Sequence, residues 1–107
     1  MDNTKLKEVN MPIYVVLANW TDQGIRTVKD SPKRLDATRK AIEAAGGRLL
    51  GFYLTMGKYD EVLIVEGPSD EVAATMALSS GSQGNVRTET LKAFSEDEYR
   101  KIIANIP

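Results

Sequence analysis

Two stretches of this chain are apolar at nearly every position, and they constrain the fold more than any other feature. The first covers residues 13–18 (IYVVLA) and the second residues 62–65 (VLIV). Both are rich in β-branched residues, which favours strands. Successive side chains of a strand point to opposite faces, so a strand that is apolar throughout needs cover on both faces. The sequence therefore predicts a sheet whose two faces are both buried.

The remaining pattern gives an order of elements. Strands are predicted at residues 12–20, 48–56, 60–66 and 86–94. A short helical turn follows Thr21, and a longer helix runs from Pro32 to Gly46 with an apolar stripe at three- and four-residue spacings. A second main helix begins after Ser69 and stops before a small-residue loop at residues 79–85.

Capping residues mark the ends of these helices. Thr21, Ser31 and Ser69 are predicted caps, with Pro32 in the first position after Ser31. The pair at residues 46–47 (GG) ends the first long helix, because glycine accepts the left-handed backbone that this end requires. A last helix follows a capping box at residues 95–98 (SEDE), and it presents one apolar face formed by Tyr99, Ile102, Ile103 and Ile106.

The resulting order is β-α-β-β-α-β with an extra C-terminal helix, which is the ferredoxin-like α+β order. In that topology four antiparallel strands carry both helices on one face, and the first and third strands are central. Residues 1–10 are predicted to be a flexible tail, and residues 11–107 a single domain. The apolar central strands then leave a second face to cover. We expect an isologous homodimer packed sheet to sheet, the arrangement of a dimeric α+β barrel.

The composition narrows the chemistry. The chain of 107 residues contains neither cysteine nor histidine, which excludes thiolate nucleophiles, Ser-His-Asp triads and histidine-held haem. We expect no cofactor and no metal, since Asp60 and Glu66 lie too far apart along one strand to share an ion. A net charge of −1 gives no field for nucleic acid, and no stretch is long enough to span a membrane. A cytoplasmic protein is expected.

At this point the sequence resembles the GYD-domain family of small proteins over about residues 11–95. The name-giving residues appear as Gly57-Lys58-Tyr59-Asp60, with one residue inserted before the tyrosine. The resemblance implies a dimeric α+β barrel and carries no settled activity. Its other motifs are Tyr14, Thr21-x-Gln23-Gly24, Pro32-x-Arg34, Gly46-Gly47, Tyr53-x-x-x-Gly57 and the segment Val86 to Phe94.

Tyr59 and Asp60 form the first candidate site. The phenol is able to donate to a bound oxygen, and the carboxylate to accept or act as a base. The alternative is a structural turn, in which the carboxylate bonds nearby backbone groups and Gly57 supplies an unusual backbone angle. The structural interpretation is favoured.

Thr21, Gln23 and Arg87 are the polar candidates. Thr21 and Gln23 open a helical turn whose free N–H groups suit an anion, although capping alone explains Thr21. Arg87 begins the last strand, where it either clamps a carboxylate or phosphate, pairs with Glu89, or blunts an edge strand.

Aromatic residues on the strands are candidates for lining an apolar cavity between the sheet and its partner. Phe52 and Tyr53 cannot share a face, because they are adjacent on one strand. Tyr53, with its polar tip, is the better candidate of that pair. The full set is Tyr14, Trp20, Phe52, Tyr53 and Phe94.

Three functions remain open from the sequence. The leading one is a homodimer that binds a small apolar or amphipathic molecule between its paired sheets. The second is an enzyme similar to the cofactor-independent monooxygenases or isomerases of the dimeric α+β barrel type, with Tyr14, Tyr53, Tyr59 or Asp60 moving protons. The third is an assembly module whose interface fills the interior with side chains.

Overall fold

A computed structural model describes residues 11–107, so the predicted tail at residues 1–10 lies outside the described residues. The elements follow the predicted order, with a short 3-10 helix, η1, added before the first long helix. They are β1 (Ile13–Trp20), α2 (Asp22–Arg26), η1 (Val28–Asp30), α3 (Ser31–Ala44), β2 (Arg48–Leu54), β3 (Glu61–Glu66), α4 (Asp70–Ser82), β4 (Val86–Ala93) and α5 (Glu96–Ala104).

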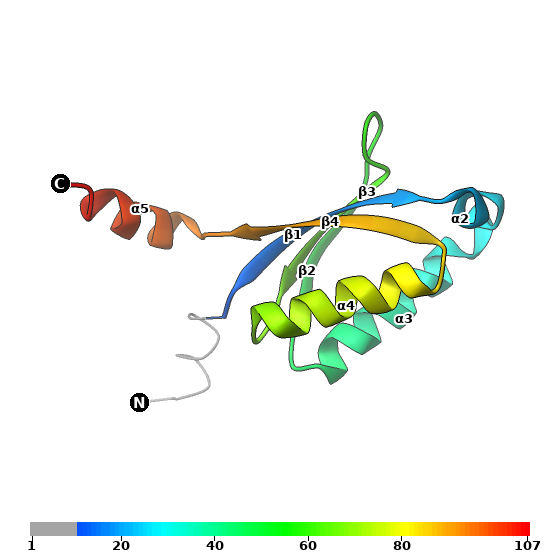
Figure 1. Ribbon diagram of the computed structural model, residues 1–107, viewed down its shortest axis with the longest axis horizontal. Helices are drawn as coiled ribbons and strands as arrows, with labels where there is room; N and C mark the ends of the chain where they lie inside the picture. The colour runs from blue at the N-terminus through cyan, green and yellow to red at the C-terminus, as the bar shows by residue number, and fades with distance from the viewer. Residues whose placement is uncertain (1–10) are drawn as a thin grey trace.

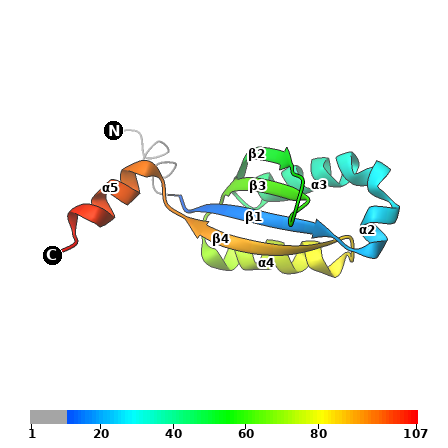
Figure 2. The ribbon, with the colours of Figure 1, turned by 90° about the horizontal axis from the view of Figure 1, so that it is seen from above.

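The four strands form one antiparallel sheet in the order β2-β3-β1-β4, so the two apolar strands β1 and β3 are central. Helices α3 and α4 lie together on one face of this sheet (Figure 1). The other face carries no helix and is turned toward the viewer in Figure 2. The ferredoxin-like α+β prediction is confirmed.

The strand register shows which apolar side chains lie on each face of the sheet. On β1, the alternate residues Tyr14 and Ala18 face the helices and are 4% and 2% exposed. Val15 takes the opposite face, paired with Ile64 of β3 and Leu91 of β4. The most buried apolar side chains all belong to the helix side, which is therefore the core of the single chain.

The edge strand β2 is irregular. Its pairing with β3 shifts register between Leu49 and Gly51, which is the signature of a β-bulge. Leu50, at the shift, is 45% exposed. The bulge leaves Phe52 on the helix face and Tyr53 on the open face, as strand alternation predicts.

Most predicted caps are present. The Thr21 hydroxyl accepts from the Gly24 N–H, the Ser69 hydroxyl accepts from the Val72 N–H, and Ser95 begins a capping box. Gly46 has a φ of 91°, in the left-handed region.

The prediction that Ser31 caps α3 is wrong. Ser31 already has helical backbone angles, because its N–H donates to the carbonyl of Val28 and η1 runs directly into α3. The cap position belongs to Asp30, whose side chain makes no capping hydrogen bond.

The prediction of a loop over residues 79–85 is also wrong in part. Helix α4 continues to Ser82, and the Ser82 hydroxyl donates to the carbonyl of Ser79 within the last turn. Serine and glycine lower helix propensity without forbidding a helix, so packing over β4 decides the outcome. The chain turns only at Gly84, whose φ is 85°.

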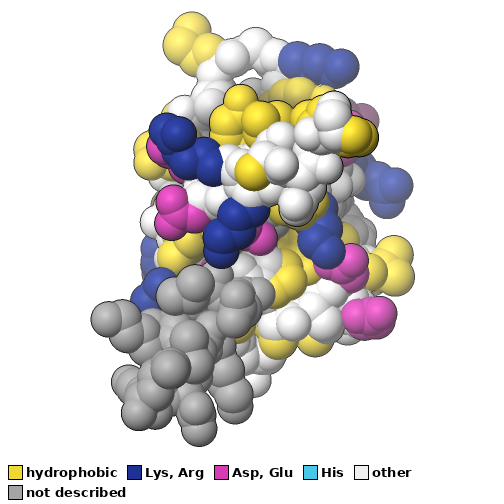
Figure 3. All heavy atoms as spheres, turned by 90° about the vertical axis from the view of Figure 1, so that its left-hand side faces the viewer, with side chains coloured by type: hydrophobic (Ala, Val, Ile, Leu, Met, Phe, Trp, Pro, Cys, Tyr) yellow, Lys and Arg dark blue, Asp and Glu magenta, His cyan; other side chains and the backbone are white. Residues whose placement is uncertain are grey.

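Helix α5 projects from the end of the sheet, away from α3 and α4 (Figure 1). Its apolar stripe is uncovered, with exposed fractions of 57% at Tyr99, 46% at Ile102, 47% at Ile103 and 63% at Ile106. Seen from this end, hydrophobic side chains lie at the surface among side chains of both charges (Figure 3). Within residues 11–107, no helix combines the length and apolar character needed to cross a membrane.

The close approach of α2 to the start of β4 gives a first prediction. A Cβ on Gly24 would lie 1.9 Å from the carbonyl oxygen of Asn85, whereas one on Gly81 would meet nothing nearer than 3.8 Å. We expect Gly24→Ala to lower the free energy of unfolding by about 2 kcal/mol or more. Gly81→Ala is the control, because Gly81 lies in a helix. It is expected to raise the free energy of unfolding by roughly 0.5–1 kcal/mol. Urea unfolding followed by circular dichroism measures both, and equal effects would contradict the steric argument.

Candidate functional site

A cavity of about 240 Å³ lies between the two long helices and the sheet. Helix α3 packs over the edge strand β2, and α4 over the opposite edge strand β4, so the middle of the sheet lies beneath the gap between them. The sides of the helices that line this gap carry small residues among larger apolar ones such as Leu35, Ile42 and Met76. The small residues are Ala37, Ala41 and Ala45 of the α3 segment and Ala73, Ala77 and Ser80 of α4. Side chains of this size leave the space open unless the helices approach more closely.

The floor of the cavity is apolar and aromatic. Tyr14, Trp20 and Phe52 line it, so three of the five predicted aromatic candidates reach a cavity. Tyr53 is 61% exposed on the open face, and Phe94 is 58% exposed beyond the end of β4. The cavity lies on the helix side of the sheet, whereas the sequence predicts one between the sheet and its dimer partner.

Two charged residues of the lining, Glu61 and Arg34, lie near the Trp20 end of β1 and interact electrostatically. Burial among apolar side chains raises the pKa of the half-buried Glu61 carboxyl, the positive charge of Arg34 lowers it, and the negative charge of Asp60 raises it further. The Arg34 guanidinium donates to the carbonyl oxygens of Thr27 and Gly24, at 3.1 and 3.2 Å. Arg34 therefore holds the start of α3 against the α2 turn.

Glu61 was not among the candidate site residues predicted from the sequence. A signal for it existed, because it is an acidic residue that directly precedes the apolar run of a central strand. Strand alternation places it on the same face as Leu63, which is helix-facing and only 9% exposed.

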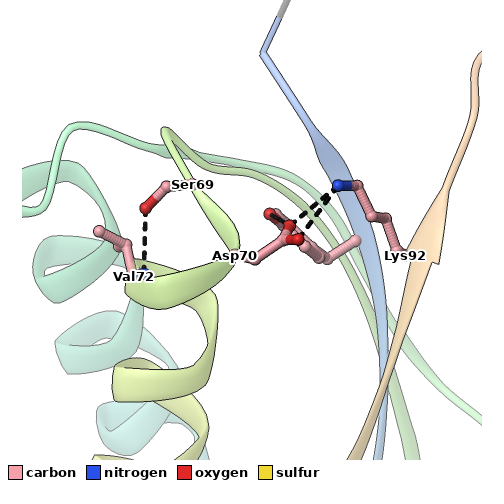
Figure 4. Close-up of polar contacts among 5 residues, drawn as sticks. Ser69, Asp70, Val72 and Lys92 are labelled. Atoms are coloured by element: carbon pink, nitrogen blue, oxygen red, sulfur yellow. Dashed lines mark hydrogen bonds and ion pairs between the residues drawn. The ribbon is translucent and has the colours of Figure 1, made fainter.

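At the other end of β1, Tyr14 contacts Asp70, and Figure 4 shows Asp70 beside Lys92. The Tyr14 hydroxyl donates to Asp70 Oδ1 at 2.5 Å, and Lys92 Nζ lies 3.1 Å from the same carboxylate oxygen. Burial and the acceptor Asp70 raise the pKa of Tyr14 to about 12. The hydrogen bond from Tyr14, and then that from Lys92, lower the pKa of Asp70. At neutral pH the phenol keeps its proton, so it is poorly suited to act as a base.

Tyr59 and Asp60 make contacts within the chain. Asp60 Oδ2 accepts from the backbone N–H of Trp20 at 3.0 Å, and the Asp60 N–H donates to the carbonyl of Ala18 at 3.0 Å. The Tyr59 hydroxyl donates to Glu89 Oε2 at 2.5 Å, and this contact raises the pKa of Tyr59. Both residues tie the β2–β3 turn to neighbouring strands, which supports the structural interpretation.

Thr21 and Gln23 also bind other parts of the chain. The Thr21 hydroxyl donates to the carbonyl of Gly84 at 2.5 Å while it caps α2. The Gln23 amide donates to the carbonyl of Gln83 and to Asn85 Oδ1, at 3.1 and 3.0 Å. These contacts hold the loop between α4 and β4 against α2.

Arg87 lies exposed on the edge strand β4. No ion pair joins it to Glu89 or to any other acidic side chain within residues 11–107. Over the same residues, no three acidic side chains gather as a metal site would require.

The role of Asp60 gives a second prediction. Asp60→Ala removes the acceptor of the Trp20 N–H and is expected to lower the free energy of unfolding by about 1–2 kcal/mol. Asp60→Asn keeps an acceptor oxygen at that place, so its free energy of unfolding should fall much less. Chemical denaturation of the two variants checks this, and an Asn variant as unstable as the Ala variant would mean that charge, not the hydrogen bond, holds the turn.

The fold and the cavity together define a small α+β protein of ferredoxin-like topology with a hollow between its helix layer and its sheet. The model of the GYD domain matches residues 14–103. The chain therefore belongs to the GYD domain family, as its motifs indicated.

Two further proteins are similar to this chain. A Thermus thermophilus protein named "Glutamine synthetase and cystathionine beta-lyase binding protein" is 34% identical over 85 residues, which are 78% of this chain and 90% of that protein. The crystal structure of the Mycobacterium tuberculosis leucine response regulatory protein LrpA superposes with a TM-score of 0.54 at 15% identity. That match covers 89% of this chain and 57% of the LrpA chain, and it supports the fold alone.

Proposed function

We propose that the protein is a homodimer that binds a small apolar or amphipathic molecule in the cavity between α3, α4 and the sheet. The observation that carries this proposal is the cavity itself, which is apolar over most of its wall and carries the charged residues Arg34, Glu61 and Glu66. The placement differs from the sequence expectation of a ligand between two sheets, because the space lies on the helix side.

The dimer part of the proposal rests on the uncovered face of the sheet. This face is apolar at its centre, where Val15 and Leu17 of β1 lie beside Val62 and Ile64 of β3, and Leu91 of β4 extends it at 45% exposure. Apolar patches of this kind on a sheet mark an interface, and a twofold arrangement buries the same patch on both copies.

A catalytic function has less support from the side chains. Tyr14 and Tyr59 each donate to a carboxylate, and Asp60 accepts from backbone, so three of the four proposed proton carriers already have partners. Tyr53 lies on the open face, away from the cavity.

A second candidate function is the binding of another protein. The name of the Thermus relative describes that protein as a binding protein of glutamine synthetase and cystathionine beta-lyase. The exposed stripe of α5 offers this chain a helix face of the kind that lies in a groove of a partner. If protein binding is the function, the apolar stripe of α5 contacts a different protein and the cavity holds no ligand.

The sheet-to-sheet dimer gives a third prediction. We expect the protein to be a dimer at micromolar concentration in size-exclusion chromatography with light scattering. Ile64→Lys places a charge at the centre of the open face and should shift the population to monomer, because an unpaired charge is costly in an interface. Leu78→Lys, on the outer side of α4 at 76% exposure, is the control and should remain dimeric. A monomeric wild-type protein would refute the dimer.

The cavity gives a fourth prediction. Trp20 is the single tryptophan and lines the cavity, so its fluorescence reports occupancy. We expect decanol to change this fluorescence saturably, and Ala41→Leu to weaken its binding about tenfold by filling the space. Ala44→Leu, one turn further on the same helix and outside the cavity lining, should bind as wild type does. Equal binding by both variants would place the ligand elsewhere.

A further inference from the structure

We propose that the molecule held in this cavity carries a basic, hydrogen-bond-donating head group, a primary amine on an apolar body, and that Glu61 receives it. The inference rests on the proposed ligand-binding function and names the chemistry of the ligand.

The position of Glu61 suits this role. It is the first residue of β3 and lies opposite Ala18 of β1, which is only 2% exposed. Its side chain lines the cavity at the same end as Trp20. Between Tyr14 and Trp20 the lining follows β1 for six residues, which is roughly 20 Å at strand spacing. An elongated molecule is thus able to place its head at Glu61 and its apolar body along the floor.

The Glu61 carboxylate lacks a partner in the described part of the chain, since no hydrogen bond or ion pair reaches it. Glu66, at the far end of the same strand, differs from Glu61 because its carboxylate has a partner. It is 7% exposed and is paired with Arg48 at 3.1 Å. Burial raises the pKa of this half-buried Glu61 carboxyl, so its charge is partly desolvated, and a hydrogen-bond donor in the cavity would stabilise it.

The charges around the head-group position favour a cation. The charged residues that line the cavity are Arg34, Glu61 and Glu66, and Glu66 is already neutralised by Arg48. Asp60 adds its negative charge from the β2–β3 turn, while α4 and the loop after it contribute the uncharged Gln83 and Asn85. The Arg34 guanidinium keeps its positive charge, which acts on Glu61, but its N–H groups donate to the carbonyls of Gly24 and Thr27.

The test compares three probes of equal chain length, decylamine, decanol and decanoate, by titration of Trp20 fluorescence below their micelle-forming concentrations. Wild-type protein is expected to bind decylamine at least about tenfold more tightly than decanoate. Glu61→Gln should lose about tenfold in affinity for decylamine while its affinity for decanol changes little. Glu43→Gln, an exposed acidic residue of α3 outside the cavity lining, is the matched control and should behave as wild type.

The Glu61→Gln variant is expected to fold. The raised pKa of Glu61 means that its charge opposes folding at pH values above its ordinary value near 4.5, so removing that charge should raise stability at neutral pH. The gain should disappear as the pH falls below that value, where the unfolded chain is also protonated. Decylamine binding to wild type should weaken as the pH falls through the raised pKa, and decanol binding should not.

The outcomes separate the two proposals. If none of the three probes changes Trp20 fluorescence in the wild type, the ligand-binding function itself fails. If all three bind, Ala41→Leu weakens them equally, and Glu61→Gln leaves the preference unchanged, the cavity binds ligands but the head-group inference is overturned. Preferential binding of decanoate would also overturn it.

Discussion

The placement of the two long helices over opposite edges of the sheet is the constraint on which the rest of this structure depends. Helix α3 packs mainly over β2 and α4 mainly over β4, and a cavity remains between them above the central strands. The central strands β1 and β3 therefore contribute to both the core and the cavity on the helix side, and their other face carries no helix. Their unbroken apolar sequence fits these surroundings, because the helix face packs in the core and lines the cavity while the open face presents an apolar patch.

Much of the fold was predictable because the signals were local. Thr21, Ser69 and Ser95 make their capping contacts as their spacing indicated, and Gly46 adopts the left-handed backbone. The errors fell where tertiary packing overrides propensity. Ser31 is already helical, and α4 extends through a serine- and glycine-rich end that its sequence alone disfavours.

The candidate site was harder to predict than the fold. The aromatic lining by Tyr14, Trp20 and Phe52 follows from strand alternation, but a cavity depends on the distance between two helices that are far apart in sequence. Glu61 is a candidate because no side chain of the described residues pairs with its carboxylate. No local sequence pattern reveals the absence of such a partner. The conspicuous residues Tyr59 and Asp60 bind other strands of the chain. In this protein, the residues that identify the family fasten a turn, and the acidic residue beside them lines the cavity.

The bulge in β2 has a consequence for how copies of this protein meet. An edge strand with regular pairing offers a row of backbone groups to any strand that arrives beside it, and the shift between Leu49 and Gly51 interrupts that row. Growth of the sheet into a continuous ribbon is hindered at this edge. In the proposed dimer the copies meet through the broad faces instead, and a twofold contact of that kind closes after two copies and does not extend without limit.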